Sequence, residues 1–590
     1  MSGADAAGTT VLDAARAGLA QDPDEVTRAE LSAIVDAAAS GDEAALADLA
    51  DRFGSRLQFG TAGLRGRLGA GSNRMNRVLV SQAAAGFAAY LRGKAAPGTT
   101  PLVVIGYDGR RNSDVFARDS AELFAGAGLR AVLLPRMLPT PVLAFAVRHL
   151  GAAAGVMVTA SHNPPDDNGY KVYLGGADHG SQIISPADAE IAAHIDRVAA
   201  TSLVPDLARA AYEIADESVI SAYVAATAAV APATAGAAGM NWVYTAMHGV
   251  GSETLHAILD LAGYPRPRVV EAQIAPDGRF PTVAFPNPEE PGAMDLAFET
   301  ARAVGADFVI ANDPDADRLA VALPDETAPG GWRRLTGNEI GLLLGWRAAA
   351  RAGERGETGS LACSLVSSPG LQTVAEHYGL DFHATLTGFK WISRAPGILY
   401  GFEEALGYLV NPETVRDKDG ISAAVAILGM IADARERGES LADLLRGFQE
   451  TFGFFASGQV SLRVDDLSVI GRIMSALRQA PPARVGAVAV TGIDDLLTGA
   501  GGVPASDVLR LWLEDGSRLI VRPSGTEPKL KAYLDVRGTS AADAQERLAA
   551  LDAATRTLLP CPPPPLPPPS RHVSTEPPRS CAANRGGSVA

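Results

Sequence analysis

The stretch GVMVTASHNPPDDNGYKVY (Gly155–Tyr173) contains two β-type runs separated by a polar loop. Pro164-Pro165 stops the loop, and Asn168-Gly169 predicts a tight turn before the second run, Tyr170–Leu174. This pattern predicts that Ser161 lies at an exposed loop tip. Our hypothesis is that Ser161 carries a phosphoryl group, which requires a metal, a phosphate-binding loop and a sugar site elsewhere in the chain.

Strand and helix signals alternate around this stretch. PLVVIGY (residues 101–107) is a nearly continuous apolar run, which is typical of a buried parallel strand. Ser113 is a candidate N-cap for a helix that continues through Phe124. The alternation begins again at residues 241–245 and near Gly337, so we predict three α/β units in series.

The two ends of the chain have a different texture. Residues from about 10 to 52 have helical spacings of Leu and Val and contain no catalytic pattern. Short β-like runs follow residue 450, and Asp515-Gly516 predicts a hairpin turn between two of them. The predicted divisions are a helical extension (1–52), three α/β domains (53–215, 216–330 and 331–450), an α+β domain (451–558) and a Pro-rich disordered tail (559–590).

Composition and charge exclude several classes of protein. The 590 residues carry a formal net charge of -16, which argues against nucleic-acid or acidic-membrane binding, because those partners require excess Lys and Arg. Cys363, Cys561 and Cys581 form neither a disulfide framework nor a zinc motif, as expected in a reducing compartment. No apolar run reaches the roughly 20 residues that span a bilayer, and the N-terminus is acidic where a signal peptide is basic. We therefore expect a soluble, cytoplasmic protein.

The segment NDPDADR (Asn312–Arg318) directly follows the apolar run FVIA. In an extended segment alternate side chains point the same way, so Asp313, Asp315 and Asp317 are expected to present three carboxylates on one side. Such carboxylates repel unless a cation lies among them, and hard oxygen ligands favour Mg²⁺ or Ca²⁺. An EF-hand is excluded because the sixth position is Arg318 rather than Gly. The alternative is a solvated acidic turn.

Two loops have the residues of an anion site. LQFGTAGLRGRLG (Leu57–Gly69) combines four glycines with Arg65, and RPSGTEPK (Arg522–Lys529) combines a glycine with hydroxyls and cations. Each of them alone remains open to the alternative of an ordinary turn. Two further segments, Thr387–Lys390 and Gly401–Tyr408, are predicted as strand-to-helix loops, in which the glutamates would either accept hydrogen bonds from sugar hydroxyls or simply begin a helix.

Taken together, these segments resemble the α-D-phosphohexomutase superfamily, which includes phosphoglucomutases and phosphomannomutases. Seven motifs occur in family order across residues 55 to 535: FGTAGLRG, GYDGR, TASHNPPDDNGYK, NDPDADR, TGFK, GFEEALGY with DKDG, and RPSGTEPK. The resemblance implies an α/β protein with four domains around a central cleft. Three of them are similar α/β units with mixed sheets, and the fourth is a C-terminal α+β domain.

The resemblance also implies roles for individual residues. Ser161 corresponds to the phosphoserine, and its phosphoryl oxygen would bind Mg²⁺ together with Asp313, Asp315 and Asp317. Arg65, His162 and Lys171 are similar to the polar groups around the reacting phosphoryl, with the general base either Lys171 or His162. The implied substrate-binding residues are Thr61, Arg65, Arg318, Thr387, Gly388, Glu403, Ala405, Lys418, Arg522, Ser524, Gly525 and Thr526.

The implied reaction interconverts the 1- and 6-phosphates of glucose or mannose through a sugar bisphosphate, in a monomer or weak dimer. Hexose-specific members commonly have Glu-Glu-Ser in the sugar loop, whereas this chain has Glu403-Glu404-Ala405. This departure is similar to the branch that includes phosphopentomutase and glucose-1,6-bisphosphate synthase. Three hypotheses follow: a hexose-phosphate mutase, a pentose-phosphate mutase or sugar-bisphosphate synthase, and a non-catalytic sugar-phosphate-binding homologue. The presence of both a nucleophile and metal ligands argues against the third.

Overall fold

The computed structural model describes residues 3–464, 466–499, 504–524 and 529–559. The chain divides into two compact units. The larger comprises Met1–Leu323, Arg334–Ser367 and Val374–Leu445, and the smaller comprises Pro324–Arg333, Ser368–Thr373 and Arg446–Ala590. The predicted Pro-rich tail lies outside the described residues, apart from residue 559 itself.

Three helices open the larger unit, as the sequence predicts: α1 (Gly3–Gln21), α2 (Glu25–Ala39) and α3 (Glu43–Phe53). Asp24 and Asp42 N-cap α2 and α3 by accepting main-chain hydrogen bonds. The three helices share a small core that includes Ala15, Leu31 and Leu49, and Ala70 from the segment after β1 completes it. This extension therefore packs as a layer of helices on the start of the first α/β domain.

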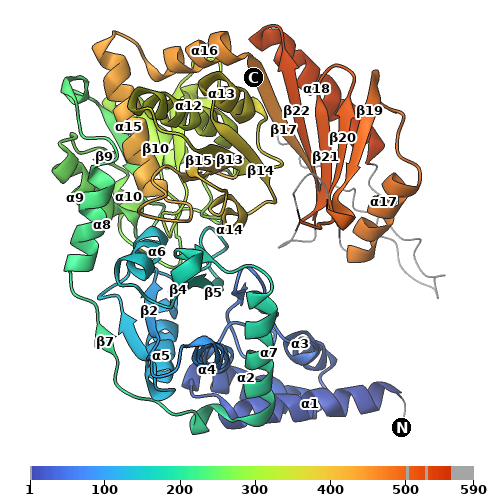
Figure 1. Cartoon of the computed structure of the whole chain (residues 1–590). Helices are drawn as coiled ribbons and strands as arrows, with labels where there is room; N and C mark the ends of the chain where they lie inside the picture. Colours follow the sequence, from blue (N-terminus) through green and yellow to red (C-terminus); the bar gives the residue numbers. More distant parts are fainter. Residues whose placement is uncertain (1–2, 465, 500–503, 525–528, 560–590) are drawn as a thin grey trace. The chain divides into compact units, whose positions relative to one another are not determined.

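The first sheet has the strand order β1-β5-β4-β2-β3-β7, with β6 paired to β5. Figure 1 labels four of its strands, β2, β4, β5 and β7. Pairing is parallel among β4, β2, β3 and β7, and antiparallel where β5 joins β4 and β1. The strands are β1 (Leu64–Arg67), β2 (Leu102–Tyr107), β3 (Arg130–Leu133), β4 (Ala154–Val158), β5 (Asp167–Leu174), β6 (Ser181–Gln182) and β7 (Glu213–Ile214). The helices are α4 (Arg77–Lys94), α5 (Ser113–Gly126), α6 (Thr140–His149) and α7 (Ala187–Thr201).

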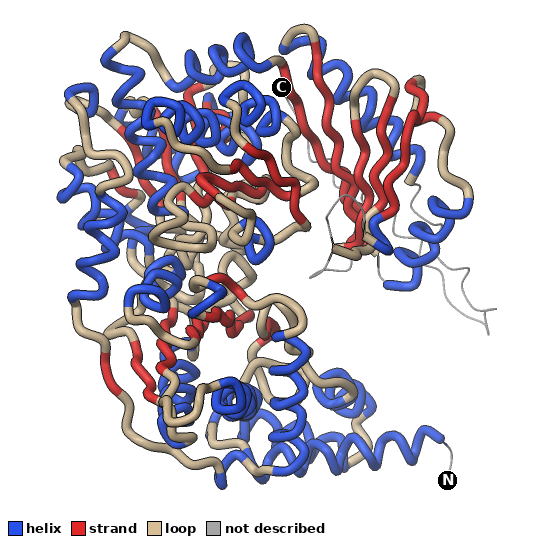
Figure 2. Tube along the Cα trace, in the orientation of Figure 1, coloured by secondary structure: helices blue, strands red, loops and turns tan. Residues whose placement is uncertain are grey.

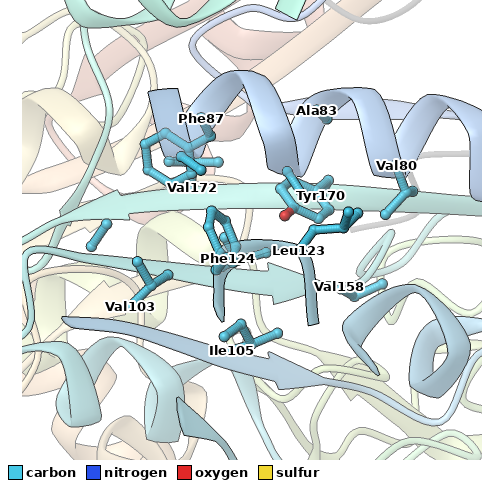
Figure 3. Close-up of a cluster of buried hydrophobic side chains, with 14 of the residues drawn as sticks. Val80, Ala83, Phe87, Val103, Ile105, Leu123, Phe124, Val158, Tyr170 and Val172 are labelled. Carbon is cyan, nitrogen blue, oxygen red and sulfur yellow. The ribbon is translucent and has the colours of Figure 1, made fainter. Parts of the chain in front are cut away.

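Helices cover both faces of this sheet. Figure 3 shows Phe87 of α4 beside Val172 of β5, with Phe124 of α5 between them and Val103 of β2, in one cluster on one face of the sheet. Ile105 of β2 belongs to the same cluster. Side chains alternate between the faces of a strand, so Gly106 faces the other way. There a Cβ would lie 3.4 Å from the Cβ of Leu143 on α6. The first sheet is thus buried on both faces, as its apolar strands predict.

The second sheet contains β9, β8, β10 and β11 in that order, with β11 antiparallel to β10 and the other pairs parallel. Its strand β10 is the predicted FVIA run and is completely buried. The elements of this part of the chain are α8 (Ser218–Ala228), β8 (Trp242–Thr245), α9 (Gly251–Ala262), β9 (Arg268–Val269), α10 (Glu271–Ile274), α11 (Asp295–Val304), β10 (Phe308–Ala311), β11 (Ala320–Pro324) and β12 (Trp332–Arg334).

The third sheet has the order β14-β13-β15-β16, parallel except for the β15–β16 hairpin. A capping box formed by Thr336 and Glu339 begins the helix α12. The elements are α12 (Gly337–Arg355), β13 (Ser360–Ser364), α13 (Gly370–Tyr378), β14 (Asp381–Thr385), α14 (Phe389–Ile392), β15 (Ile398–Glu403), β16 (Gly407–Leu409), α15 (Gly420–Glu436) and α16 (Leu441–Phe452). Three α/β units with mixed sheets are thereby confirmed.

The smaller unit contains an antiparallel sheet in the order β17-β22-β21-β20-β19-β18, drawn as adjacent red strands in Figure 2. Leu511, Leu519 and Leu534 lie in its core. The predicted hairpin turn at Asp515-Gly516 joins β20 to β21. The elements are β17 (Phe454–Arg463), α17 (Leu467–Gln479), β18 (Arg484–Val485), β19 (Val488–Asp495), β20 (Leu509–Leu513), β21 (Arg518–Pro523), β22 (Lys529–Gly538) and α18 (Ala541–Leu558).

Three local predictions are wrong. Asn168-Gly169 lies inside β5 instead of forming a turn, because Asn168 donates side-chain hydrogen bonds to the Arg111 carbonyl and the Ser113 hydroxyl. Ser113 is inside α5 and not its N-cap, since its hydroxyl donates to Asp108. Gly401–Tyr408 forms a strand-to-strand hairpin and not a helix start, because β16 pairs with β15.

Candidate active site

Ser161 lies between β4 and β5 in residues 159–166, which we call the serine loop. Ser161 is only 2% exposed, so the prediction that it lies at an exposed loop tip is wrong. The Ser161 Oγ donates a hydrogen bond to Asp313 Oδ2 at 2.8 Å and lies 3.2 Å from His162 Nδ1. Its φ of 51° is in the left-handed region that few residues other than glycine adopt. The serine is therefore held in a strained turn against the loop after β10.

The loop after β2, GYDGR, holds the serine loop in this shape. Asp108 accepts hydrogen bonds from the hydroxyls of Ser113 and Thr159, and the Thr159 Oγ1 accepts one from the Ser161 main-chain N–H at 2.8 Å. The buried guanidinium of Arg110 donates to main-chain carbonyls of the serine loop and the start of β5, those of Ser161, Asn163, Pro164 and Asp167. Both charged groups of GYDGR thus act on the conformation of the loop that bears Ser161.

The three aspartates of NDPDADR gather at the end of β10. Asp313, Asp315 and Asp317 are all fully buried, and one carboxylate oxygen of each lies within 4.8 Å of those of the other two. The segment is a turn with Ala316 at a φ of 55°, so the predicted extended conformation is wrong although the predicted convergence of the carboxylates is right. Thr140 Oγ1 at the start of α6 donates to Asp315 Oδ2 at 2.6 Å.

The triad has the properties of a metal site. Within the described part of the chain, the Oδ1 atoms of Asp315 and Asp317 are buried without a hydrogen-bond partner. Burial, together with the charges of Asp315 and Asp317, raises the pKa of Asp313 well above its ordinary value. A divalent cation would satisfy the orphaned oxygens and relieve the repulsion. These residues, and the Ser161 oxygen beside Asp313, therefore fit a metal ion.

Two lysines lie beside the triad. Lys171 Nζ, on β5, is 2.7 Å from Asp315 Oδ2 and 2.9 Å from Asp317 Oδ2, and Lys418 Nζ is 3.2 Å from Asp317 Oδ2. Burial opposes the charge of Lys171, but the neighbouring carboxylates outweigh it and raise the pKa of Lys171 above its ordinary value. The pKa of Lys418 is raised in the same way, against burial, by Asp317 and Asp417. Both lysines are therefore positively charged at neutral pH.

His162 and Arg65 flank Ser161. Burial lowers the pKa of His162 well below its ordinary value, and the charges of Arg318 and Arg65 lower it further, so the imidazole is neutral at pH 7. Arg65 lies on β1 opposite Gly169 of β5, and its Nη1 donates to Asn163 Oδ1 at 3.1 Å. The antiparallel pairing of β1 with β5 thus places a guanidinium at the serine loop.

The predicted sugar loops meet the aspartate loop. Arg318 Nη1 donates to the main-chain oxygen of Ala405 at 3.0 Å, in the turn between β15 and β16. Glu403 Oε1 accepts a hydrogen bond from the Gly388 N–H at 3.0 Å, which ties this hairpin to the loop before α14. Burial and the adjacent charge of Glu403 raise the pKa of Glu404 to about 7.

The other predicted site residues are divided between the two units. Thr61 accepts a hydrogen bond from Lys390 Nζ, and Thr387 lies in the loop between β14 and α14. Arg522 and Ser524 lie in the smaller unit, at the end of β21 and just after it. Gly525 and Thr526 of the same predicted phosphate loop lie outside the described residues.

Four residues of the site were not predicted from the sequence: Asp108, Arg110, Thr140 and Lys390. Asp108 and Arg110 had a usable signal, since two charged residues directly follow an apolar strand in the same way as the aspartate triad does. Thr140 gave no such signal, because its contact with Asp315 joins α6 to a loop far along the chain.

Family models for phosphoglucomutase/phosphomannomutase match most of the chain. The α/β/α domain I model matches residues 56–202, domain II residues 221–327, domain III residues 336–452, and the C-terminal domain residues 476–553. The four matches follow the three mixed sheets and the antiparallel sheet in order. Among the described residues, no helix is long and apolar enough to cross a membrane.

Individual relatives extend over nearly the whole matched region. A probable phosphomannomutase of Haemophilus influenzae is 55% identical over 82% of this chain and 98% of its own length. A probable phosphoribomutase of Schizosaccharomyces pombe is 36% identical over 88% and 93%, and a human phosphopentomutase is 34% identical over 82% and 85%. The crystal structure of a phosphoglucomutase/phosphomannomutase family protein from Burkholderia thailandensis shares the fold, with a TM-score of 0.65, 21% identity, and coverage of 86% of this chain and 98% of the other.

The fold and the site define an isomerase that transfers a phosphoryl group on a sugar, with an aspartate triad as its metal site. Its three α/β/α domains and antiparallel C-terminal domain are those of the α-D-phosphohexomutases. Within this class, the chain belongs to the phosphoglucomutase/phosphomannomutase family.

Proposed function

We propose that this enzyme interconverts the 1- and 6-phosphates of glucose or mannose through a phosphorylated Ser161. The observation that carries the proposal is the contact of the Ser161 hydroxyl with Asp313 of the triad. A nucleophile beside a metal site and between cationic side chains is suited to holding a phosphoryl group reversibly. A sugar bisphosphate is the expected intermediate and activator.

The cation proposed for the triad is Mg²⁺. Its ligands would be Asp313, Asp315, Asp317 and an oxygen of phosphorylated Ser161, because hard carboxylate and phosphate oxygens favour this ion. When bound, it supplies positive charge that neutralises the transferring phosphoryl group. Lys171 and Lys418, which contact the same carboxylates, balance the remaining negative charge.

The transfer itself moves one phosphoryl group and one proton in each direction. The bond from phosphorus to the Ser161 oxygen breaks as a bond to the oxygen of the free sugar hydroxyl forms. The proton of that hydroxyl passes to a base, which gives it to the leaving serine oxygen. Arg65 and Lys171 stabilise charge on the phosphoryl oxygens. Of the two predicted candidates for the base we favour His162, since its neutral ring lies 3.2 Å from the Ser161 Oγ, whereas the neighbouring carboxylates keep Lys171 protonated.

The remaining predicted residues would bind the substrate. We assign the sugar to the loops that bear Thr61, Arg318, Thr387, Gly388, Glu403 and Lys418. The non-reacting phosphate is assigned to Arg522, Ser524, Gly525 and Thr526. A loop that recognises only phosphate accepts either end of the bisphosphate, so the same site serves both directions of the reaction.

A pentose-phosphate mutase is the second candidate. Ala405 has no side-chain hydroxyl for the sugar, and its main-chain oxygen accepts the hydrogen bond from Arg318. Relatives at 34–36% identity include a probable phosphoribomutase and phosphopentomutases. One lost hydrogen bond changes a preference by about 0.5–1.5 kcal/mol, which is enough to reorder similar sugars.

The test of the phosphoserine is the variant Ser161→Ala, with Ser221→Ala as the matched control. Ser221 is exposed on α8, where its main-chain N–H donates a hydrogen bond to the Glu217 carbonyl. Incubation with glucose 1,6-bisphosphate should add one phosphoryl mass to the wild type and the control but none to Ser161→Ala. Interconversion of sugar phosphates should be lost only in Ser161→Ala. Turnover by Ser161→Ala comparable to that of the wild type would contradict the proposal.

The test of the substrate is the ratio kcat/KM for glucose, mannose and ribose 1-phosphates, each with and without added bisphosphate. The proposal expects the hexose phosphates to have the higher ratios. A higher ratio for ribose 1-phosphate would select the second candidate.

A further inference from the structure

A loop of the second domain packs closely on GYDGR. We call residues 276–285, which follow α10, the cover loop. Two hydrogen bonds hold this loop to His248, which follows β8. The Asp277 N–H donates to the His248 carbonyl, and His248 Nε2 bonds with Thr282 Oγ1. A Cβ at Gly278 would lie 2.8 Å from the Arg111 nitrogen and the Gly109 oxygen. The main chains of the two loops are therefore in direct contact, and only glycine fits at residue 278.

Phe280 of the cover loop lies over Arg110. The Arg110 Cζ is 4.9 Å from the centre of the Phe280 ring, within the range of a cation–π contact. Phe280 is 3% exposed and Arg110 is 4% exposed, so this contact is shielded from water. Phe280 has a φ of 46°, which is unusual for a bulky residue and indicates that the surrounding contacts impose its conformation.

The covered guanidinium is the group that shapes the serine loop. Its Nη1 donates to the carbonyls of Pro164 at 2.8 Å and Asp167 at 3.0 Å, and its Nη2 donates to those of Ser161 and Asn163. Its Nε lies 3.6 Å from Asp108 Oδ2. The guanidinium carbon lies over the ring of Phe280, while the guanidinium N–H groups donate to the serine loop. The ring of Phe285, also in the cover loop, has its centre 6.2 Å from the centre of the His162 ring.

We propose that Phe280 is a positioning residue for phosphoryl transfer, acting through Arg110 to keep Ser161 aimed at the aspartate triad. This inference rests on the proposed phosphoserine. The cover loop and the triad belong to the same domain, so the domain that holds the metal ligands also fixes the direction of the serine supplied by the first domain. In this role Phe280 acts through the guanidinium of Arg110 and not on the reacting atoms.

The experiment compares Phe280→Leu with Phe308→Leu. Leucine keeps much of the apolar volume but has no ring for the guanidinium. Phe308 is the matched control, because it is a phenylalanine of the same domain, 2% exposed, whose ring stacks on Trp242 and not on an arginine. Each protein is first phosphorylated on Ser161 with glucose 1,6-bisphosphate, and the transfer to glucose 1-phosphate is followed in a single turnover.

For Phe280→Leu, we expect the transfer rate constant to fall about tenfold or more, with KM changed less than twofold, because a displaced phosphoryl donor loses rate and not affinity. Phe308→Leu should lower the melting temperature and leave the transfer rate constant within twofold of wild type. In an Arg110→Lys background, the Phe280→Leu change should have no further effect, since the group through which it acts is gone.

Hydrogen exchange of the peptide covering residues 159–167 tests the contact without any activity. Exchange there should be faster in Phe280→Leu than in either wild type or Phe308→Leu. Unchanged exchange, a wild-type transfer rate, or an equal loss in Phe308→Leu would each overturn the positioning role. A wild type that fails to become phosphorylated would contradict the proposed function instead, and the exchange comparison would still decide whether Phe280 holds the loop.

Discussion

The two carboxylate oxygens of Asp315 have different surroundings. Its carboxylate accepts from Thr140 and pairs with Lys171, yet its second oxygen is buried without a partner in the described part of the chain. Oδ2 of Asp315 therefore makes structural contacts, while Oδ1 is available to a metal ion. Replacing Asp315 is therefore expected to affect metal binding and not the fold.

For Asp315→Ala, we predict the loss of Mg²⁺ binding and of Mg²⁺-dependent turnover, while the far-ultraviolet circular dichroism spectrum stays that of wild type. The reason is that two carboxylates hold a divalent cation much more weakly than three. Calorimetric titration with Mg²⁺ measures the effect. Asp36→Ala, an exposed aspartate on α2, is the control and should bind the ion normally. Unchanged metal affinity in Asp315→Ala would exclude the triad as the metal site.

Glu404 makes stability depend on pH. Its Oε2 accepts hydrogen bonds from the hydroxyls of Ser364 and Ser367, and burial, aided by the charge of Glu403, raises its pKa to about 7. The unfolded chain has the lower, ordinary carboxyl pKa. The folded state therefore binds the extra proton between the two values, and this contribution to stability is present at low pH and is lost as the pH rises through about 7.

We predict that Glu404→Gln removes this pH dependence. At pH 8 the variant should have a free energy of unfolding about 1–2 kcal/mol above wild type, a figure reduced by the partial exposure of the side chain, and near pH 4.5 the two should agree. Urea unfolding at several pH values measures the difference. Glu299→Gln, at an exposed residue of α11, should follow the wild-type profile. Parallel profiles for wild type and Glu404→Gln would exclude the raised pKa.

At the scale of elements, the helix α15 supports the site through its first turn. Asp419 caps it by accepting hydrogen bonds from the N–H groups of Ile421 and Ser422, and it also accepts the hydroxyl of Tyr223 from α8. Gly420 follows, where a Cβ would lie 2.2 Å from the Arg318 oxygen. The helix start thus packs directly on the end of the aspartate loop, and Gly420 cannot be replaced without moving that loop.

For Asp419→Ala, we predict a loss of about 2–4 kcal/mol in the free energy of unfolding. It removes the cap and leaves the buried hydroxyl of Tyr223 without its acceptor. Asp466→Ala is the matched control, since Asp466 caps α17 but is exposed, and it should lose only about 1 kcal/mol. Urea unfolding of both variants checks the contrast. Equal losses would mean that the contact with Tyr223 adds nothing.

Elements with an uninterrupted apolar run were predictable, and those that depend on a distant partner were not. The strands β2, β8 and β10 match their predicted runs closely, because burial on both faces leaves a clear sequence pattern. Asn168-Gly169 has strong turn chemistry, yet it lies in a strand because its partners come from elsewhere in the domain: Arg111 from the loop after β2, and Ser113 from the start of α5. The hairpin β15–β16 likewise depends on pairing that local propensity does not encode.

At the scale of the whole molecule, the order of the motifs predicted the family and the metal site, but not the way in which the site is held. The triad could be predicted because its three carboxylates are neighbours in sequence. The burial of Ser161 and the contact of Arg110 with Phe280 could not, because each joins residues of two different domains and no local pattern reports them.

The ion pairs of the triad join residues that the ribosome synthesises at different times. Lys171 is synthesised first, the aspartates follow with the second domain, and Lys418 emerges only with the third. A nascent chain that has just completed the second domain already contains all three carboxylates but still lacks one of the two lysines that pair with them. Its metal ligands are thus present before their full neutralising charge, so the site reaches its final electrostatic balance only when translation has passed residue 418.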